Sequence, residues 1–182
     1  FYGGTIGQAQ DMNNLMNLVR RMQKFNNAHF LFVGQGDEVQ LINELAIKWK
    51  LGNFSYLQSV TQGEYKDILA QVDVGLFSLS AKHTSHNFPG KLLGYMVQAL
   101  PILGSVNSDN DLINLIHDNK AGFISVNGDD ELFFHNAVKL LKNFELRRKT
   151  GLAGNALMYK EFTVVNVGFQ IIEFLSGCNK NI

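Results

Sequence analysis

The sequence predicts an α/β protein with a mostly parallel six-stranded sheet and helices on both faces. Two observations lead to this prediction. Short apolar runs alternate with longer segments of helical period, and the short runs are apolar almost throughout. Parallel strands that are buried on both faces need such runs, and crossover helices must join them. Ligands of such sheets bind at the carboxyl ends of the strands, so the loops that follow the strands are the places to look for a site.

Strands and helices are predicted to alternate up to the sixth strand, and three helices follow it. The six predicted strands are residues 1–3, 29–34, 53–58, 72–79, 101–105 and 122–126. The predicted helices are residues 11–25, 38–49, 64–72, a short segment between Pro89 and Pro101, and residues 109–117, 129–142, 144–161 and 164–174. Apolar residues in the first two helices recur every three or four positions, as on one face of a helix.

The last predicted helix has a broad apolar face. Its apolar positions are Val165, Val167, Phe169, Ile172 and Leu175. This face is wider than a lone domain usually needs to cover its core. We therefore expect part of it to be exposed, and we expect the chain to self-associate.

Composition limits the classes of function. The chain has 182 residues, 46% hydrophobic and 18% charged, which suits one soluble globular domain. Its formal net charge is zero, which argues against a general nucleic-acid binder. Cys178 is the only cysteine, so no disulfide can form within the chain. The first residues already have the pattern of a strand, which indicates a piece of a longer protein.

Two glycine-rich turns follow the first two predicted strands. The first contains Gly3, Gly4 and Gly7, and glycines there allow a tight turn and the close approach of a ligand. A turn without a ligand is an equally good interpretation of this segment. The second runs from Gly34 to Glu38, and its carboxylates are predicted to cap the next helix.

Lys91 is the most informative residue of the segment after the fourth strand. Pro89 fits the first turn of a helix, and Lys91 follows it. A lysine in a first turn opposes the helix dipole, so its presence suggests an anion site. A metal site at His83 and His86 is the alternative, but no third ligand is evident nearby. No phosphate-binding P-loop and no Gly-x-Ser-x-Gly motif occurs.

Five segments in order resemble the C-terminal, donor-binding domain of retaining family-4 glycosyltransferases of the GT-B fold. They are FYGGTIGQAQDMNNLMNLV, HFLFVGQGDEVQLI, EYKDILAQVDVGLFSL, NFPGKLLGYMVQALPILGS and FTVVNVGFQIIEFL. The resemblance implies a Rossmann-like half of a GT-B enzyme. Residues 1–182 would then be a single nucleotide-sugar-binding domain, with the N-terminal acceptor domain absent from this chain.

The resemblance also implies site residues. Three residues of the glycine loop would line the diphosphate, two would face the nucleobase, and residues 86–94 would bracket the sugar and phosphates. These are, in turn, Gly4, Thr5 and Gly7; Ser59 and Val60; and His86, Asn87, Phe88, Gly90, Lys91 and Leu92.

The chain departs from the family at several positions. Two family glutamates, eight positions apart, fall on His86 and Gly94, and the basic residues of the family's glycine loop are replaced by Thr5 and Gln10. Lys91 is then the one obvious cation for the donor. This pattern is similar to a branch with a Pro-x-Lys motif that transfers sugars of bacterial surface polysaccharides.

The function expected from this resemblance is transfer of a UDP-linked, N-acetylated sugar to a lipid-linked oligosaccharide acceptor. No metal or other cofactor and no nucleic acid is expected. The full-length enzyme is expected in the cytoplasm, in peripheral association with the inner face of the plasma membrane. One alternative is a noncatalytic Rossmann-like binding or assembly module without affinity for UDP-sugars. An NAD-dependent oxidoreductase is disfavoured because the first loop lacks G-x-G-x-x-G.

Overall fold

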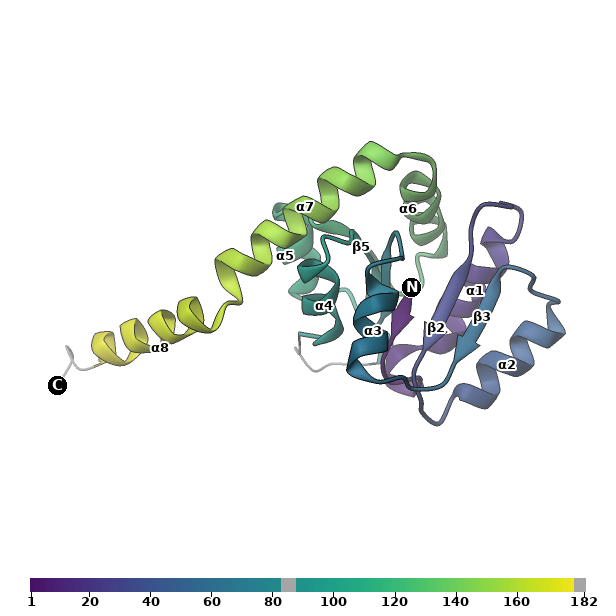
Figure 1. Ribbon diagram of the computed structural model, residues 1–182, viewed down its shortest axis with the longest axis horizontal. Helices are drawn as coiled ribbons and strands as arrows, with labels where there is room; N and C mark the ends of the chain where they lie inside the picture. Colours follow the sequence, from purple (N-terminus) through teal and green to yellow (C-terminus); the bar gives the residue numbers. More distant parts are fainter. Residues whose placement is uncertain (83–87, 179–182) are drawn as a thin grey trace.

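The computed structural model describes residues 1–82 and 88–178 (Figure 1). Its strands are β1 (Tyr2–Gly3), β2 (Phe30–Val33), β3 (Phe54–Leu57), β4 (Gly75–Ser78), β5 (Ile102–Val106) and β6 (Gly122–Val126). Its helices are the 3-10 turn η1 (Gln8–Gln10), then α1 (Met12–Met22), α2 (Val39–Lys48), α3 (Gln62–Leu69), α4 (Lys91–Val97), α5 (Leu112–Asp118), α6 (Asp130–Lys142), α7 (Phe144–Glu161) and α8 (Val164–Cys178). The predicted alternation of strands and helices is confirmed.

The strands form two parallel sheets of three strands each. Their orders are β1-β2-β3 and β4-β5-β6. The prediction of one continuous six-stranded sheet therefore needs correction. Strands β1 and β4 do lie side by side, and Leu76 N donates to Phe1 O at 2.7 Å. Because β1 has only two residues and Gly4 then turns with φ +118°, no regular ladder forms across this seam.

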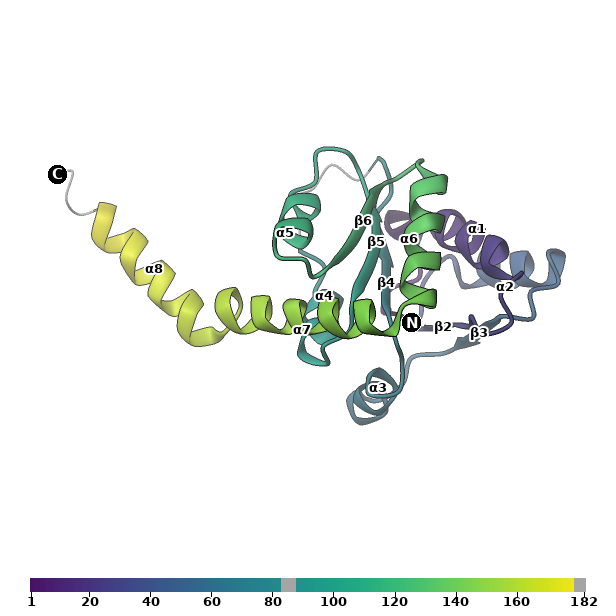
Figure 2. The ribbon, with the colours of Figure 1, turned by 90° about the horizontal axis from the view of Figure 1, so that it is seen from above.

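Helices cover both faces of the sheets, as predicted (Figure 2), and an apolar cluster lies between each face and its helices. One joins α3, α4, α5 and α7 through side chains such as Leu69, Leu92, Met96, Ile116 and Leu157. The other joins α1, α2 and α6 through side chains such as Leu15, Val19, Ile42, Phe133 and Leu140. Strands β2 and β4 contribute to both clusters, which is why their sequences are apolar almost throughout.

Capping residues set several helix starts. Helix α3 begins two residues earlier than predicted because Thr61 and Glu64 form a capping box. Asp11 caps α1 by accepting from Asn14 N. The expectation that Asp37 and Glu38 cap α2 is wrong, since neither side chain bonds to the first turn of that helix.

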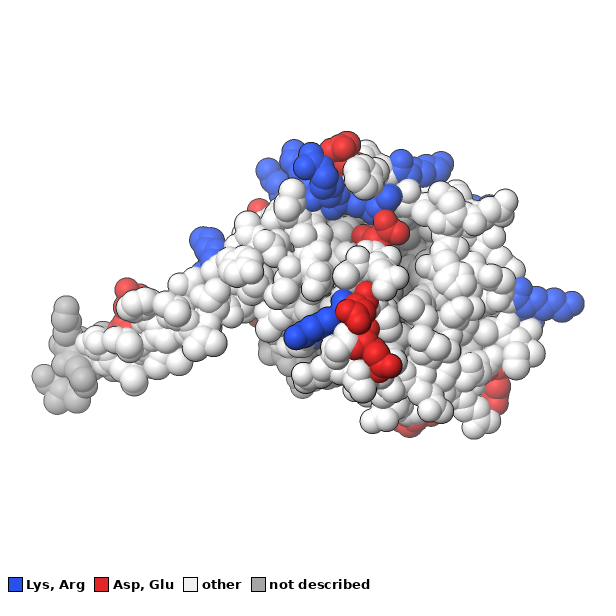
Figure 3. All heavy atoms as spheres, viewed as in Figure 1, with Lys and Arg blue, Asp and Glu red and all other residues white. Residues whose placement is uncertain are grey.

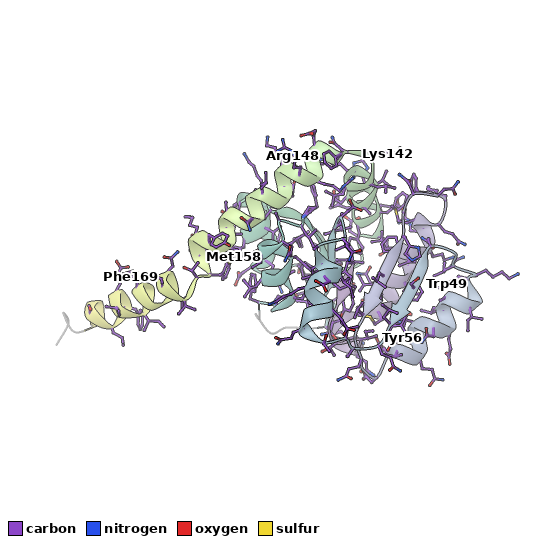
Figure 4. The ribbon with its side chains drawn as sticks, in the orientation of Figure 1. Trp49, Tyr56, Lys142, Arg148, Met158 and Phe169 are labelled. Carbon is purple, nitrogen blue, oxygen red and sulfur yellow. The ribbon has the colours of Figure 1, made fainter. Side chains whose placement is uncertain are left out.

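Helix α8 projects away from the body of the domain (Figure 1). The predicted exposure of its apolar face is confirmed: Val165 is 65% exposed, Phe169 63% and Ile172 60%. Phe169 stands clear of the domain body in Figure 4, and the projecting helix is almost free of charge in Figure 3. Within the described residues, no helix is both long enough and apolar enough to span a membrane.

Candidate functional site

Two glycine turns interlock at the carboxyl ends of β1 and β2. Gly4 N donates to Val33 O at 2.9 Å, and Ile6 N donates to Gln35 O at 2.9 Å. A Cβ atom on Gly34 would stand 1.8 Å from Gly4 O, so only glycine fits there. The backbone around Gly4 is thus fixed against the next turn. Gly4 itself has no side chain to keep a ligand from this backbone.

A hollow of about 550 Å³ opens beside Gly4. Its walls are the ends of β1 and β2, the turn from β3 into α3, and one face of α4. The lining residues are Gly4, Val33, Gly34, Ser59, Val60, Gln62, Tyr65, Lys66, Leu69, Gly94, Val97 and Gln98. The structure therefore brings together three of the predicted residues, Gly4, Ser59 and Val60, and none of the described lining residues is acidic.

Lys91 begins α4 and lies against the glycine loop. Its Nζ stands 3.8 Å from the centre of the Tyr2 ring. A Cβ atom on Gly4 would be 3.4 Å from Lys91 Cε and 3.5 Å from Nζ. The loops after β1 and β4 meet here, as predicted, and Ser80 N also donates to Ala9 O at 2.9 Å. Gly4 and Lys91 thus lie at the same end of the sheets.

The ammonium group of Lys91 is largely buried and has no acidic partner among residues 1–82 and 88–178. Burial lowers the pKa of Lys91 to about 7 from the usual 10.5. The neighbouring Tyr2 ring is itself buried, which raises the pKa of its hydroxyl. A partly desolvated cation beside an open backbone can bind an anion that would neutralise it.

The remaining predicted residues are not part of the hollow. Thr5 is exposed, and its carbonyl accepts from the Tyr2 hydroxyl. Gly7 lies against Asp37, whose Oδ1 would be 2.6 Å from a Cβ atom on that glycine. Gly90 has open space around its Cα.

Phe88 and Leu92 are taken up by packing. The Phe88 ring lies 4.8 Å from that of Phe162. Leu92 is fully buried in the core, and its N–H donates to Pro89 O at 2.9 Å. Neither side chain faces the hollow. His86 and Asn87 lie outside the described residues, as does His83.

Sequence reasoning missed three residues of this region. They are Tyr2 beneath Lys91, Lys66 in the wall of the hollow, and Tyr95, one turn after Lys91 on α4. The spacing of four residues between Lys91 and Tyr95 is a sequence signal that both side chains share one face of the helix. Tyr2 and Lys66 give no such signal because their place depends on how other elements pack.

The described residues contain no group of three or more His, Cys, Asp or Glu side chains that could hold a metal ion. The positive groups of this region are Lys66 and Lys91. The site therefore consists of two parts. The hollow suits a mostly uncharged group, and the Lys91 ammonium beside it, at the Gly4 turn, suits an anion.

Fold and site together define a domain that matches one half of a GT-B glycosyltransferase. The family described as glycosyl transferases group 1 matches residues 2–143, and the chain belongs to this family. No curated protein matches the sequence.

Several solved structures resemble this one. A TarM mutant from S. aureus, crystallised with UDP, fondaparinux and alpha-GlcNAc-glycerol, gives a TM-score of 0.78 at 15% identity over 94% of this chain and 34% of that chain. WaaG, a glycosyltransferase involved in lipopolysaccharide biosynthesis, gives a TM-score of 0.70 at 15% identity, and the match covers 91% of this chain and 44% of WaaG. The C-terminal domain of the glycosyl transferase group 1 family protein LpcC from Francisella tularensis gives a TM-score of 0.74 at 14% identity, and the match covers 90% of this chain and 86% of that domain. The chain thus spans less than half of TarM and of WaaG.

Proposed function

We propose that this domain binds the diphosphate of a UDP-sugar at the glycine turn beside Lys91 and the nucleoside part in the adjoining hollow. One observation is central to this proposal. The Lys91 ammonium is largely buried against Gly4 with no acidic partner among the described residues. Keeping a cation in such a place costs stability unless an anion binds there. A diphosphate supplies the missing negative charge.

The chemistry of sugar transfer gives this cation a role. Breaking the bond between sugar and diphosphate leaves negative charge on the phosphate oxygens. Positioned N–H groups and an ammonium group stabilise that charge as it develops. The ammonium group of Lys91 would do so without a metal ion.

The finer assignment is a C-terminal donor-binding half of a retaining family-4 enzyme that makes surface polysaccharide. Support comes from the match over most of the LpcC C-terminal domain, from the UDP and GlcNAc compound bound to TarM, and from the role of WaaG in lipopolysaccharide biosynthesis. We propose a UDP-linked, N-acetylated hexose as donor and a lipid-linked glycan as acceptor. The full-length enzyme would then work at the cytoplasmic face of the plasma membrane.

The exposed apolar surface of helix α8 supports the proposal that a second domain completes the enzyme. The apolar side chains of this helix lie exposed, among them Val164 at 90% and Phe174 at 72%. A contiguous exposed apolar patch of this kind commonly marks an interaction surface. An N-terminal acceptor domain that packs on α8 would bury these side chains and complete the active site. We therefore expect no sugar transfer by these 182 residues alone.

A noncatalytic Rossmann-like binding or assembly module is the second candidate. Gly94 faces the hollow at a position where the family has a glutamate, and none of the described lining residues is acidic. Ribose hydroxyls are commonly bound by a carboxylate. A module that lost this carboxylate could have lost its affinity for UDP-sugars.

A thermal-shift and calorimetry series decides between the two. UDP, UMP and uridine are titrated into the wild-type chain at pH 7. The diphosphate should bind most tightly, because only UDP brings two phosphates to Lys91. At 100 times its dissociation constant it should stabilise the domain by about 2.7 kcal/mol, or roughly 5–10 °C in Tm. Lys149→Met, at an exposed lysine of α7, is the matched control and should bind UDP as the wild type does.

The same series run with GDP and ADP tests the choice of base. If no nucleoside diphosphate raises Tm or gives a binding heat, the donor-binding function is wrong and the noncatalytic module is favoured. If UDP and UMP bind equally well, the diphosphate site is wrongly placed.

A further inference from the structure

Helix α4 holds the end of β1 with two side chains, one turn apart. Lys91 lies over the ring of Tyr2 and against Gly4. Tyr95 reaches the residue between them, since its hydroxyl accepts from Gly3 N at 3.2 Å. Three consecutive residues of the glycine loop are therefore in contact with one face of one helix.

The Tyr95 hydroxyl also crosses the seam between the two sheets. It donates to Leu76 O of β4 at 3.1 Å while it accepts from Gly3 N of β1. This seam has no regular ladder, and the nearest backbone bond joins Leu76 N to Phe1 O. The phenol thus links two backbone groups that a ladder would otherwise satisfy. It is fully buried, so these groups would have little access to water without it.

Two glycines make room for this arrangement. A Cβ atom on Gly75, at the start of β4, would be 2.3 Å from Cδ2 of the Tyr95 ring. A Cβ atom on Gly3 would be 2.4 Å from the hydroxyl of Tyr65. Phe1 packs edge-on against both tyrosine rings, at 5.6 Å and 6.2 Å. The Tyr95 ring is therefore fully buried, with Gly75 and Phe1 packed against it.

We propose that Tyr95 is a positioning residue for the diphosphate site: its hydroxyl ties Gly3 to Leu76 and so holds the Gly4 backbone against Lys91, beside which the diphosphate binds. This inference rests on the proposed function of the site. Tyr95 does not line the hollow, so it acts through Gly3 and the helix and does not touch the nucleotide.

Tyr95→Phe removes only the hydroxyl and keeps the ring. We expect the dissociation constant for UDP to rise about fivefold to tenfold at pH 6.5, because Gly3 N and Leu76 O both lose their hydrogen bond to the hydroxyl and the glycine turn loosens. Asn53→Ala is the matched control, because it removes a buried bond from Nδ2 to Val19 O at the amino end of β3. It should lower Tm and leave UDP binding unchanged.

The pH dependence of binding separates positioning from a general loss of stability. Burial lowers the pKa of Lys91 to about 7, so wild-type affinity for UDP should fall as pH rises from 7 to 9. A loosened seam admits water to the ammonium, and in Tyr95→Phe the fall should begin at higher pH. The other titratable groups of the seam are the hydroxyls of Tyr2, Tyr65 and Tyr95 and the α-amino group of Phe1. Burial raises the pKa of each tyrosine and lowers the pKa of the amino group to about 5, so all four stay neutral from pH 7 to 9. Lys91→Ala should show no such fall.

A measurement on the wild type covers the case in which Tyr95→Phe fails to fold. UDP should slow hydrogen exchange at the Gly3 amide. The amide of Ile124, which donates to His117 Nε2 at 3.1 Å, is the reference. Equal UDP affinity and an equal pH midpoint in Tyr95→Phe and wild type would overturn the inference, as would unchanged exchange at Gly3 in a wild type that binds UDP. A wild type that binds no nucleoside diphosphate would instead refute the proposed function.

Discussion

Replacing Lys91 with methionine should make the unliganded domain more stable and a poorer nucleotide binder. Methionine keeps most of the apolar stem of the side chain and removes the ammonium group, which lies 3.8 Å from the centre of the Tyr2 ring. The wild-type ammonium has lost most of its water and gained no acidic partner among the described residues. Lys91 is therefore the place where this domain gives up stability in order to bind an anion.

The size of the gain follows from the pKa of Lys91. Burial lowers that pKa from 10.5 to about 7. At about 1.4 kcal/mol per pKa unit, the full shift sets an upper limit of roughly 5 kcal/mol on the cost of the charge. Residual exposure of the side chain and the attraction between ammonium and ring reduce it. We expect Lys91→Met to raise the unfolding free energy by about 2 kcal/mol at pH 6.5.

The gain in unfolding free energy of Lys91→Met over the wild type should decrease as pH rises. Between pH 7 and 10.5 the unfolded chain holds a proton on Lys91 that the folded chain has lost, so wild-type stability rises with pH in this window. Below pH 7 Lys91 is charged in both the folded and the unfolded chain, so the full free-energy cost of burying its ammonium is present. The difference between variant and wild type should therefore be largest at pH 6.5 and should shrink toward pH 9.5.

Urea unfolding at pH 6.5, 8 and 9.5, with UDP calorimetry at pH 6.5, measures both effects. Binding of UDP should weaken at least tenfold in Lys91→Met, because a charge-assisted bond is worth about 1.5–3 kcal/mol. Lys149→Met should change neither quantity. The reasoning is refuted if Lys91→Met is less stable than wild type at pH 6.5, or if its stability difference grows with pH.

Three further predictions concern the glycine turns, the hollow and α8. Gly34→Ala should lower Tm by about 5 °C or more, since the new Cβ would stand 1.8 Å from Gly4 O; Gly52→Ala, with nothing within 4 Å, is the control in the same calorimetric scan. Gly94→Glu should fit, because its Cβ meets only Leu69 Cδ1 at 3.5 Å, and it should raise the preference for UDP over 2′-deoxy-UDP severalfold in calorimetry; an unchanged ratio would remove Gly94 from the ribose site. The double variant Phe169→Lys, Ile172→Glu should abolish self-association in sedimentation while leaving Tm unchanged, whereas a wild-type chain that is monomeric at high concentration would contradict the apolar-patch argument.

Local pattern was enough to predict most of the fold. Strand β6 and helix α7 have the bounds that the sequence predicts, 122–126 and 144–161, because apolar runs and helical period are properties of neighbouring residues. The exposed face of α8 was also predictable, since an apolar stripe of that width exceeds what one domain covers. The meeting of Gly4 and Lys91 followed from topology alone, because the carboxyl ends of parallel strands share one edge.

Tertiary structure alone decided the properties that make Lys91 and Tyr95 informative. Gly3 and Tyr95 are 92 positions apart in the chain, and no local pattern pairs them. The burial of Lys91 and the packing of Leu92 in the core depend on how α4 packs against the strands. Sequence therefore determined which elements form and which loops meet. The distances between groups, and with them the cost of an unpaired charge, exist only once those elements are packed together.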